Sequence, residues 1–293
     1  MTEKQNMTEI FPEGYAFNLS DFALFLAVMK NRKAYENTLS IILDEPDIKM
    51  EEVKVEQVIL NRYGKRAIRL DAWGKTVDNR QINMEMENNI HDDVKKRSRY
   101  YQGLLDSPVL KAGKNTKYKE LPSTVIIFIT KDDIFGKDLA KYTFTEQCEE
   151  ITGLHLEDGT TKIFLNMTSK NGSKELISLL QYMKDTRLDN PEIKVKDERL
   201  IELDKIVSEV KESEEWEAVE MNILEVGISN GEKKKLVSQV CKKLKKGCSP
   251  EEIANILEED INVIQKICEA AEKCEPKYEA EKAWLEYLKI RNN

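Results

Sequence analysis

The fold of this chain is decided by residues 67–88, which read AIRLDAWGKTVDNRQINMEMEN. Apolar and polar side chains alternate within residues 67–73 and again within residues 82–87, and this period of two predicts two strands. Asp78 and Asn79 lie between the two strands and favour a tight turn. The segment is therefore expected to form an antiparallel hairpin.

The flanking segments place this hairpin in a mixed α/β sheet. Helical spacing of apolar residues predicts one or two helices over about 20–44, and residues 53–60 predict a strand ahead of the hairpin. A helix expected over about 91–105 is followed by residues 123–130, a continuous apolar run that is typical of a strand buried on both faces. The order α-β-β-β-α-β predicts a mixed sheet with a crossover helix.

The hairpin carries three carboxylates, with Asp71 on its first strand and Glu85 and Glu87 on its second. Side chains two residues apart on a strand point to the same face, and Asp71 can reach them if the register allows. Three such oxygen ligands suit Mg²⁺ or Mn²⁺, which can activate a water for phosphodiester hydrolysis. A half-buried strand with a solvated acidic face is the simpler interpretation, because such spacings recur by chance in an acidic chain.

A longer ordered string of residues is more specific than the carboxylates alone. It consists of RLD at 69–71, NMEME at 83–87, RSRYYQGLL at 97–105, KYKELP at 117–122 and TKDD at 130–133. This string resembles the PD-(D/E)XK nuclease family transposases, also called recombination-promoting nucleases, and the likeness runs from about residue 15 to residue 183. The resemblance implies a restriction-endonuclease-like αβββαβ core and the activity of a metal-dependent DNA endonuclease.

The resemblance also implies roles for individual residues. Asp71 and Glu85 match the two metal-binding acids, so that Mg²⁺ or Mn²⁺ is the implied cofactor. Glu87 stands where the wider fold has Lys and this family usually has Gln, and it joins the implied catalytic set as an auxiliary ligand or as a group that orients water. Because a carboxylate supplies no positive charge, the alternative is a weakened or inactive nuclease-fold protein that acts as a DNA- or protein-binding regulator.

The helix expected after the hairpin carries a basic stretch. The candidate contacts to DNA phosphates are Lys95, Lys96, Arg97 and Arg99. The two arginines could instead brace the carboxylates by hydrogen bonding. A helix with its arginines outside and Tyr101 packed on the sheet is the simpler interpretation, and the pattern favours it for Tyr101.

Composition shifts near residue 190, which predicts a nuclease-like domain over 1–190 and an all-helical C-terminal region over 191–293. Within that region, residues 232–275 have a helix-turn-helix-like spacing. Seven Lys and one Glu give residues 232–247 a charge of +6, whereas two Lys and eight acids give residues 248–275 a charge of −6. An acidic recognition helix would face phosphates, so we expect a module that docks on itself, on another copy or on a partner, with only its lysine-rich helix able to contact DNA. A solvated charged bundle fits the pattern equally well.

The overall composition excludes several classes of protein. The 293 residues include 46 Lys and Arg against 54 Asp and Glu, and the net charge of −8 argues against nucleic-acid binding by bulk charge alone. The five cysteines form no CxxC pair, which predicts reduced thiols. The longest apolar stretch, Phe22–Met29, is far shorter than the roughly 20 residues of a membrane span. We expect a cytoplasmic protein with DNA as its partner, no membrane segment and no organic cofactor; a homo-oligomer is among the alternatives.

Overall fold

The computed structural model describes residues 15–59, 67–88, 93–109 and 117–291, and for residues 224–230 and 291 it describes the backbone alone. The chain divides into two compact units, one comprising residues 16–217 and the other comprising residues 218–293 together with Tyr15 among the described residues. The division therefore lies later than the boundary expected near residue 190.

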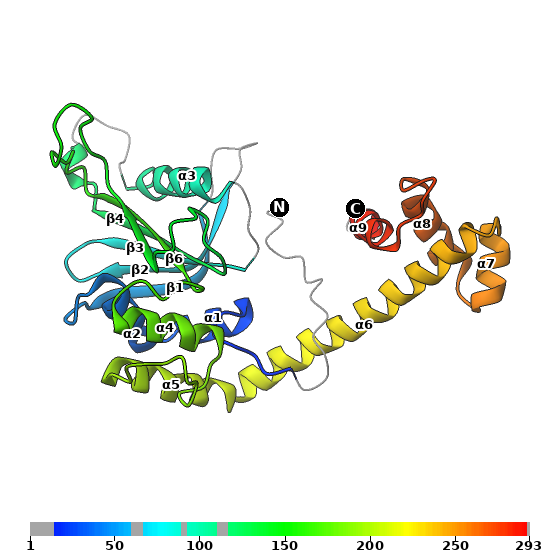
Figure 1. Ribbon diagram of the computed structural model, residues 1–293, viewed down its shortest axis with the longest axis horizontal. Coiled ribbons are helices and arrows are strands. Elements are labelled where there is room, and N and C mark those ends of the chain that lie inside the picture. The colour runs from blue at the N-terminus through cyan, green and yellow to red at the C-terminus, as the bar shows by residue number, and fades with distance from the viewer. Residues whose placement is uncertain (1–14, 60–66, 89–92, 110–116, 292–293) are drawn as a thin grey trace. The chain divides into compact units, whose positions relative to one another are not determined.

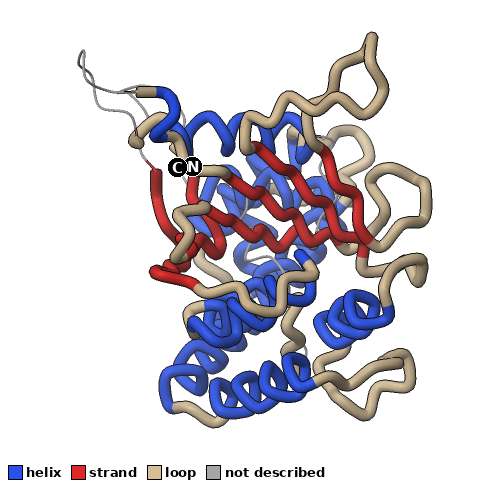
Figure 2. The backbone as a smooth tube through the Cα atoms, turned by 90° about the vertical axis from the view of Figure 1, so that its left-hand side faces the viewer, coloured by secondary structure: helices blue, strands red, loops and turns tan. Residues whose placement is uncertain are grey.

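Within the described part of the first unit, six strands form one mixed sheet, drawn in red in Figure 2. In chain order they are β1 (Met50–Ile59), β2 (Ile68–Thr76), β3 (Gln81–Glu87), β4 (Thr124–Thr130), β5 (Lys141–Phe144) and β6 (Thr160–Asn166). The order across the sheet is β1-β2-β3-β4-β6-β5. The pairs β3/β4 and β4/β6 are parallel and the other neighbours are antiparallel, so the predicted mixed sheet is confirmed.

Helices cover both faces of this sheet (Figure 1). On one face lies α3 (Val94–Asp106), and on the other lie α1 (Phe22–Met29), α2 (Arg32–Leu43) and α4 (Lys174–Lys184). All residues of β3 and β4 are buried, as expected for strands between two helical layers. The predicted helices and the doubly buried strand are thus confirmed.

The β2–β3 hairpin is pinned to α2 by one tyrosine. Asn79 adopts a left-handed conformation in the turn (φ 68°), which asparagine tolerates well. The fully buried Tyr35 of α2 donates a hydrogen bond of 2.9 Å from its hydroxyl to the backbone oxygen of Ile82. A Cβ at Gly74 would lie 3.0 Å from the ring of Tyr35 and 2.4 Å from Cε of Met50, so glycine is needed for this close approach. The hairpin that carries the carboxylates is therefore fixed against α2 on the face of the sheet opposite α3.

Polar contacts attach α5 (Glu198–Lys211) to the first unit and explain why that unit continues past residue 190. Tyr182 of α4 donates a hydrogen bond of 2.7 Å to Asp204 of α5. Asn37 of α2 donates one of 2.9 Å to Glu202. The compositional shift near residue 190 therefore marks the start of the all-helical part of the chain. The boundary between the two units lies later, between residues 217 and 218.

The second unit is helical throughout its described elements. These are the later part of α6 (Glu214–Leu244), α7 (Pro250–Leu257), α8 (Ile261–Glu272) and α9 (Ala280–Arg291). A capping box of Ser249 and Glu252 begins α7. α6 runs without a break from Glu214 to Leu244 and includes Gly227 and Gly231. A glycine inside a helix costs only about 1 kcal/mol, which the rest of a long helix can offset.

Apolar side chains from all four helices form the core of this unit. They include Val237 and Val240 of α6, Ile253 of α7, Ile264 of α8 and Trp284 of α9. None of the helices in the described ranges combines the length and apolar character that crossing a bilayer requires.

Candidate functional site

The three predicted carboxylates lie together where β2 and β3 run beneath α3. Antiparallel pairing aligns Ala72 with Met84, and one further step along the strands would place Asp71 opposite Glu85. Glu87 follows on the same face of β3 as Glu85. The exposed fractions of Asp71, Glu85 and Glu87 are 1%, 0% and 5%, so the acids form a buried group and not the solvated face of the simpler interpretation.

Two hydrogen bonds between side chain and backbone hold Asp71 against the Glu85–Met86 segment of β3. The backbone nitrogen of Asp71 donates to Oε1 of Glu85 over 2.9 Å, and the backbone nitrogen of Met86 donates to Oδ2 of Asp71 over 3.1 Å. Carboxylate oxygens thus accept bonds that carbonyl oxygens accept in a regular ladder. These bonds hold the two carboxylates next to each other.

The sheet is also irregular on the β1 side of Asp71. Pairing between β1 and β2 includes Val55 with Ala72 and Gln57 with Leu70 but skips the position between them. There, Glu56 has a φ of 51°, in the left-handed region that non-glycine residues seldom occupy. Backbone strain of this kind concentrates at functional sites, where the surrounding structure sustains it. The distortion therefore coincides with the first predicted metal ligand.

Asn83 supplies a further oxygen beside this pair. Its Nδ2 donates to Oε1 of Glu85 over 3.0 Å, and the side chain is fully buried. Within the described residues, Oδ1 of Asn83 has no hydrogen-bond partner. An unsatisfied buried polar group costs about 1–3 kcal/mol, so such an atom calls for a ligand. Two carboxylates and an amide oxygen form the all-oxygen donor set that a hard divalent cation prefers.

Glu87 is bound to Arg97 of α3. Nη2 of Arg97 donates a hydrogen bond to Oε2 of Glu87, and the guanidinium carbon lies 5.1 Å from the centre of the Phe128 ring. Burial opposes the charged form of Arg97, but the charges of Glu87, Tyr101 and Glu85 and the bond to Glu87 together hold its pKa above the ordinary value. A cation therefore stands beside the acid that replaces the usual Lys or Gln.

The three carboxylates do not form one metal-binding group. Among the residues that the structure describes, no group of three or more His, Cys, Asp and Glu side chains could hold a metal ion. Asp71 and Glu85, the two expected metal ligands, lie together, and Glu87, expected as an auxiliary ligand or as a group that orients water, is bound to Arg97. Two carboxylates are nevertheless a common protein contribution to Mg²⁺, since waters and substrate phosphates complete its coordination. The residues present therefore fit such an ion.

Comparison with protein families identifies the family of this chain. The sequence model of the PD-(D/E)XK nuclease family transposases matches residues 20–222. The chain belongs to this family. Comparison with curated proteins finds no match, and comparison with solved structures finds none either. The matched range includes the whole sheet and the three carboxylates Asp71, Glu85 and Glu87, so the predicted family and the αβββαβ core are both confirmed.

The basic residues of this PD-(D/E)XK family member fall into two groups on α3. Lys95, Lys96 and Arg99 are exposed. Lys95 and Arg99 are four residues apart, which places these two on one side of the helix. Nζ of Lys95 lies 4.4 Å from the centre of the Phe135 ring. Arg97 faces the sheet instead, with a side chain that is only 11% exposed. The structure thus places Arg97 against a carboxylate, and the other three side chains on the surface.

Two features of the nuclease-family site were missed or left open by the sequence. No role was assigned to Asn83, although its position two residues before Glu85 puts both on one face of a strand. Arg97 had two alternatives, and the structure supports the bracing one. Tyr101 is 2% exposed and packs against Phe128 at 6.2 Å between ring centres, which confirms the packing predicted for it.

Proposed function

We propose that this chain is a divalent-metal-dependent DNA endonuclease that hydrolyses phosphodiester bonds in recombination or transposition. The observation that carries the proposal is the pair Asp71–Glu85, whose carboxylates accept hydrogen bonds from the backbone nitrogens of Met86 and Asp71, beside the unpartnered oxygen of Asn83. Family membership supports nuclease chemistry in general. The choice of Mg²⁺ or Mn²⁺, the DNA substrate and a cytoplasmic location are parts of this proposal.

Each acidic residue has a distinct task in the proposed reaction. Asp71 and Glu85 would hold the metal, with Oδ1 of Asn83 available as a neutral oxygen ligand. A divalent ion bound there supplies an activated water and charge stabilisation for the leaving oxyanion. Glu87, fixed through Oε2 by Arg97, would orient the attacking water. Arg97 supplies from the helix the positive charge that Glu87 itself lacks.

The exposed side of α3 would position the substrate. Lys95, Lys96 and Arg99 are long cationic side chains on the helix that covers the carboxylates. Contacts to phosphates fix the register of a duplex but carry no sequence information. We therefore assign these three residues to DNA binding and expect their loss to weaken binding evenly across sequences.

The test is cleavage of supercoiled plasmid by the purified chain with Mg²⁺ or Mn²⁺, with EDTA as the blank. Glu85→Gln keeps the size of the side chain and removes the charge that holds a hard cation, so cutting should fall at least about 100-fold, more than loss of an outer-shell partner costs. Glu36→Gln is the matched control, because Glu36 is also buried and also accepts a backbone N–H bond, from Met50 over 2.9 Å. A folded Glu85→Gln variant that cuts at the parent rate would refute the assignment.

A non-catalytic regulator is the second candidate. It is favoured by the binding of Glu87 to Arg97 and by the lack of a three-acid metal group among the described residues. On that account the parent chain binds DNA but cuts none of it with either metal. Cutting that starts with metal and stops with EDTA would exclude this candidate.

A further inference from the structure

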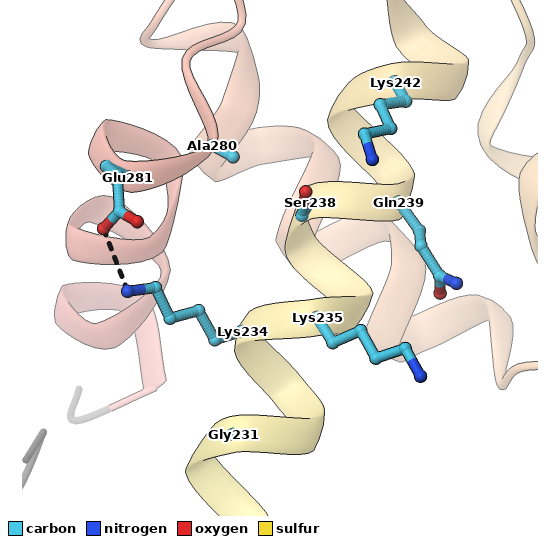
Figure 3. A pocket seen from close by; sticks show the side chains of 8 residues that line it. All are labelled: Gly231, Lys234, Lys235, Ser238, Gln239, Lys242, Ala280 and Glu281. Atoms are coloured by element: carbon cyan, nitrogen blue, oxygen red, sulfur yellow. Dashed lines mark ion pairs between the residues drawn. The ribbon is translucent and has the colours of Figure 1, made fainter. Parts of the chain in front are cut away.

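A pocket of about 400 Å³ opens between α6 and α9 in the second unit (Figure 3). It is lined by Gly231, Lys234, Lys235, Ser238, Gln239, Lys242, Ala280 and Glu281. Three lysines and one glutamate give the lining a net charge of +2. This pocket lies outside the range of the family match, which ends at residue 222.

The helix spacing explains how the lysines come to line one pocket. Lys234, Ser238 and Lys242 follow each other at intervals of four, and Figure 3 shows them on the side of α6 that faces α9. The apolar positions Val237 and Val240 lie between them in sequence and are fully buried in the core of the unit. Eight residues of helix rise about 12 Å, so the α carbons of Lys234 and Lys242 lie about 12 Å apart along the axis with Ser238 between them.

Much of this positive charge is available to a ligand. In the described part of the chain, neither Lys235 nor Lys242 takes part in an ion pair, and both are exposed. Lys234 pairs with Glu281 over 3.0 Å, but the glutamate side chain is 77% exposed, and such surface pairs are weak. A stronger anion can therefore displace Glu281. On the α9 side of the pocket, Ala280 contributes only a methyl group to the lining.

We propose that this pocket binds the phosphodiester backbone of double-stranded DNA without reading its sequence. Ammonium groups, the hydroxyl of Ser238 and the amide of Gln239 are all donors suited to phosphate oxygens. A row of about 12 Å matches three to four base-pair steps of 3.4 Å, so its two ends can meet different phosphates. The acidic segment over residues 248–275 excludes DNA from the surfaces of α7 and α8 and confines it to the α6 side.

The choice of DNA as the polyanion rests on the proposed nuclease function, but the binding site itself does not require that the chain cuts. Binding is therefore measured in EDTA, where cleavage is stopped, and cutting is measured separately. Loss of plasmid cutting with DNA binding intact would contradict the nuclease proposal alone. DNA binding that does not change when the pocket lysines are replaced, with cutting intact, would contradict the pocket proposal alone.

The experiment is fluorescence anisotropy of a labelled duplex of mixed sequence, with the full chain, over a series of salt concentrations. The variant Lys235→Gln/Lys242→Gln removes the two lysines without ion pairs, and Lys266→Gln/Lys277→Gln removes two exposed lysines elsewhere in the same unit. Each phosphate contact contributes about 0.9 to the slope of log affinity against log salt, so the pocket variant should flatten the slope by about 2. The control variant should keep the parent slope.

A third variant tests the sign of the effect. Glu281→Gln removes the carboxylate that competes for Lys234, so DNA affinity should rise a few-fold, whereas Glu269→Gln on the exposed surface of α8 should leave it unchanged by comparison. Equal affinity and slope for the parent, the pocket variant and the control would overturn the proposal. The proposal would also be overturned if the parent chain does not bind DNA but forms dimers that dissociate with salt. In that case the acidic surface of a second copy would occupy the pocket.

Discussion

The two charged regions of this molecule differ in how their charges are held. The carboxylates of β2 and β3 are buried, and backbone N–H groups and Arg97 fix them in place. The lysines of the α6–α9 pocket are at least partly exposed, and the pair Lys234–Glu281 is the bond drawn there. Buried charges are little screened and costly to leave alone, whereas exposed ones are screened and exchange partners easily. We therefore expect large, salt-independent effects at the first region and graded, salt-dependent effects at the second.

Reversing one buried charge should have the largest effect. Glu87→Lys places an ammonium against the guanidinium of Arg97, and loss of one partner of a buried pair already costs about 3–5 kcal/mol. We expect the single variant to unfold at far lower urea or not to fold. The swapped variant Glu87→Lys/Arg97→Glu should regain part of the loss in urea denaturation followed by circular dichroism. A single variant as stable as the parent would show that the two side chains do not meet.

Separating the two regions by truncation should also have a large effect, which depends on where the chain is cut. A chain ending at Glu217 keeps α5 and Trp216, whose ring packs edge-on against Phe17 at 5.3 Å. It should unfold cooperatively and cut DNA with metal, while its DNA binding becomes less dependent on salt. A chain ending at Asn190 loses the bonds of α5 to α2 and α4 and should be markedly less stable. Equal stability of the two truncated chains would show that α5 does not stabilise the first unit and that this unit ends near residue 190.

A milder change at the buried region sharpens the role of Glu87. Glu87→Gln installs the residue usual in the family, and its amide oxygen can still accept the bond from Arg97. We expect plasmid cutting within about tenfold of the parent and a stability loss of about 1–3 kcal/mol, because the bond remains but the buried Arg97 loses the negative charge that faces it. If cutting disappears while the circular dichroism spectrum and the unfolding transition are kept, Glu87 is a metal ligand.

The smallest effect is expected at the exposed pair. Lys234→Gln removes one partner of an ion pair in which the side chains are 38% and 77% exposed. The urea midpoint should stay within the error of measurement, since exposed pairs contribute about 0–1 kcal/mol. Arg97→Gln, measured alongside, should lower the midpoint clearly. Equal shifts for the two variants would remove the distinction between the regions.

The hairpin and its two metal-binding candidates could be predicted from local pattern. An alternation of period two and the turn at Asp78 and Asn79 together determine the register, and the register places Asp71 next to Glu85. The doubly buried strand was equally clear from its apolar run, since no polar side chain interrupts residues 125–129. These features depend on neighbours within about 20 residues.

Other features depend on how distant elements pack. Whether Arg97 points to solvent or to Glu87 is set by the rotation of α3 on the sheet, which the helix sequence alone leaves open. The attachment of α5 rests on pairs such as Asn37–Glu202, which are far apart in sequence. The sequence left Glu87 open as an auxiliary ligand or as a group that orients water, and its bond to Arg97 depends on a side chain from another element.

The central claim is that Asp71 and Glu85 hold a divalent ion. Its most direct test is Mn²⁺ binding at equilibrium, followed by the electron paramagnetic resonance signal of the unbound ion, with the parent, Glu85→Gln and Glu36→Gln compared at equal concentration. We expect the parent and Glu36→Gln to reduce the signal equally, and a folded Glu85→Gln chain to reduce it far less. Equal binding by all three chains would show that Asp71 and Glu85 do not hold the ion.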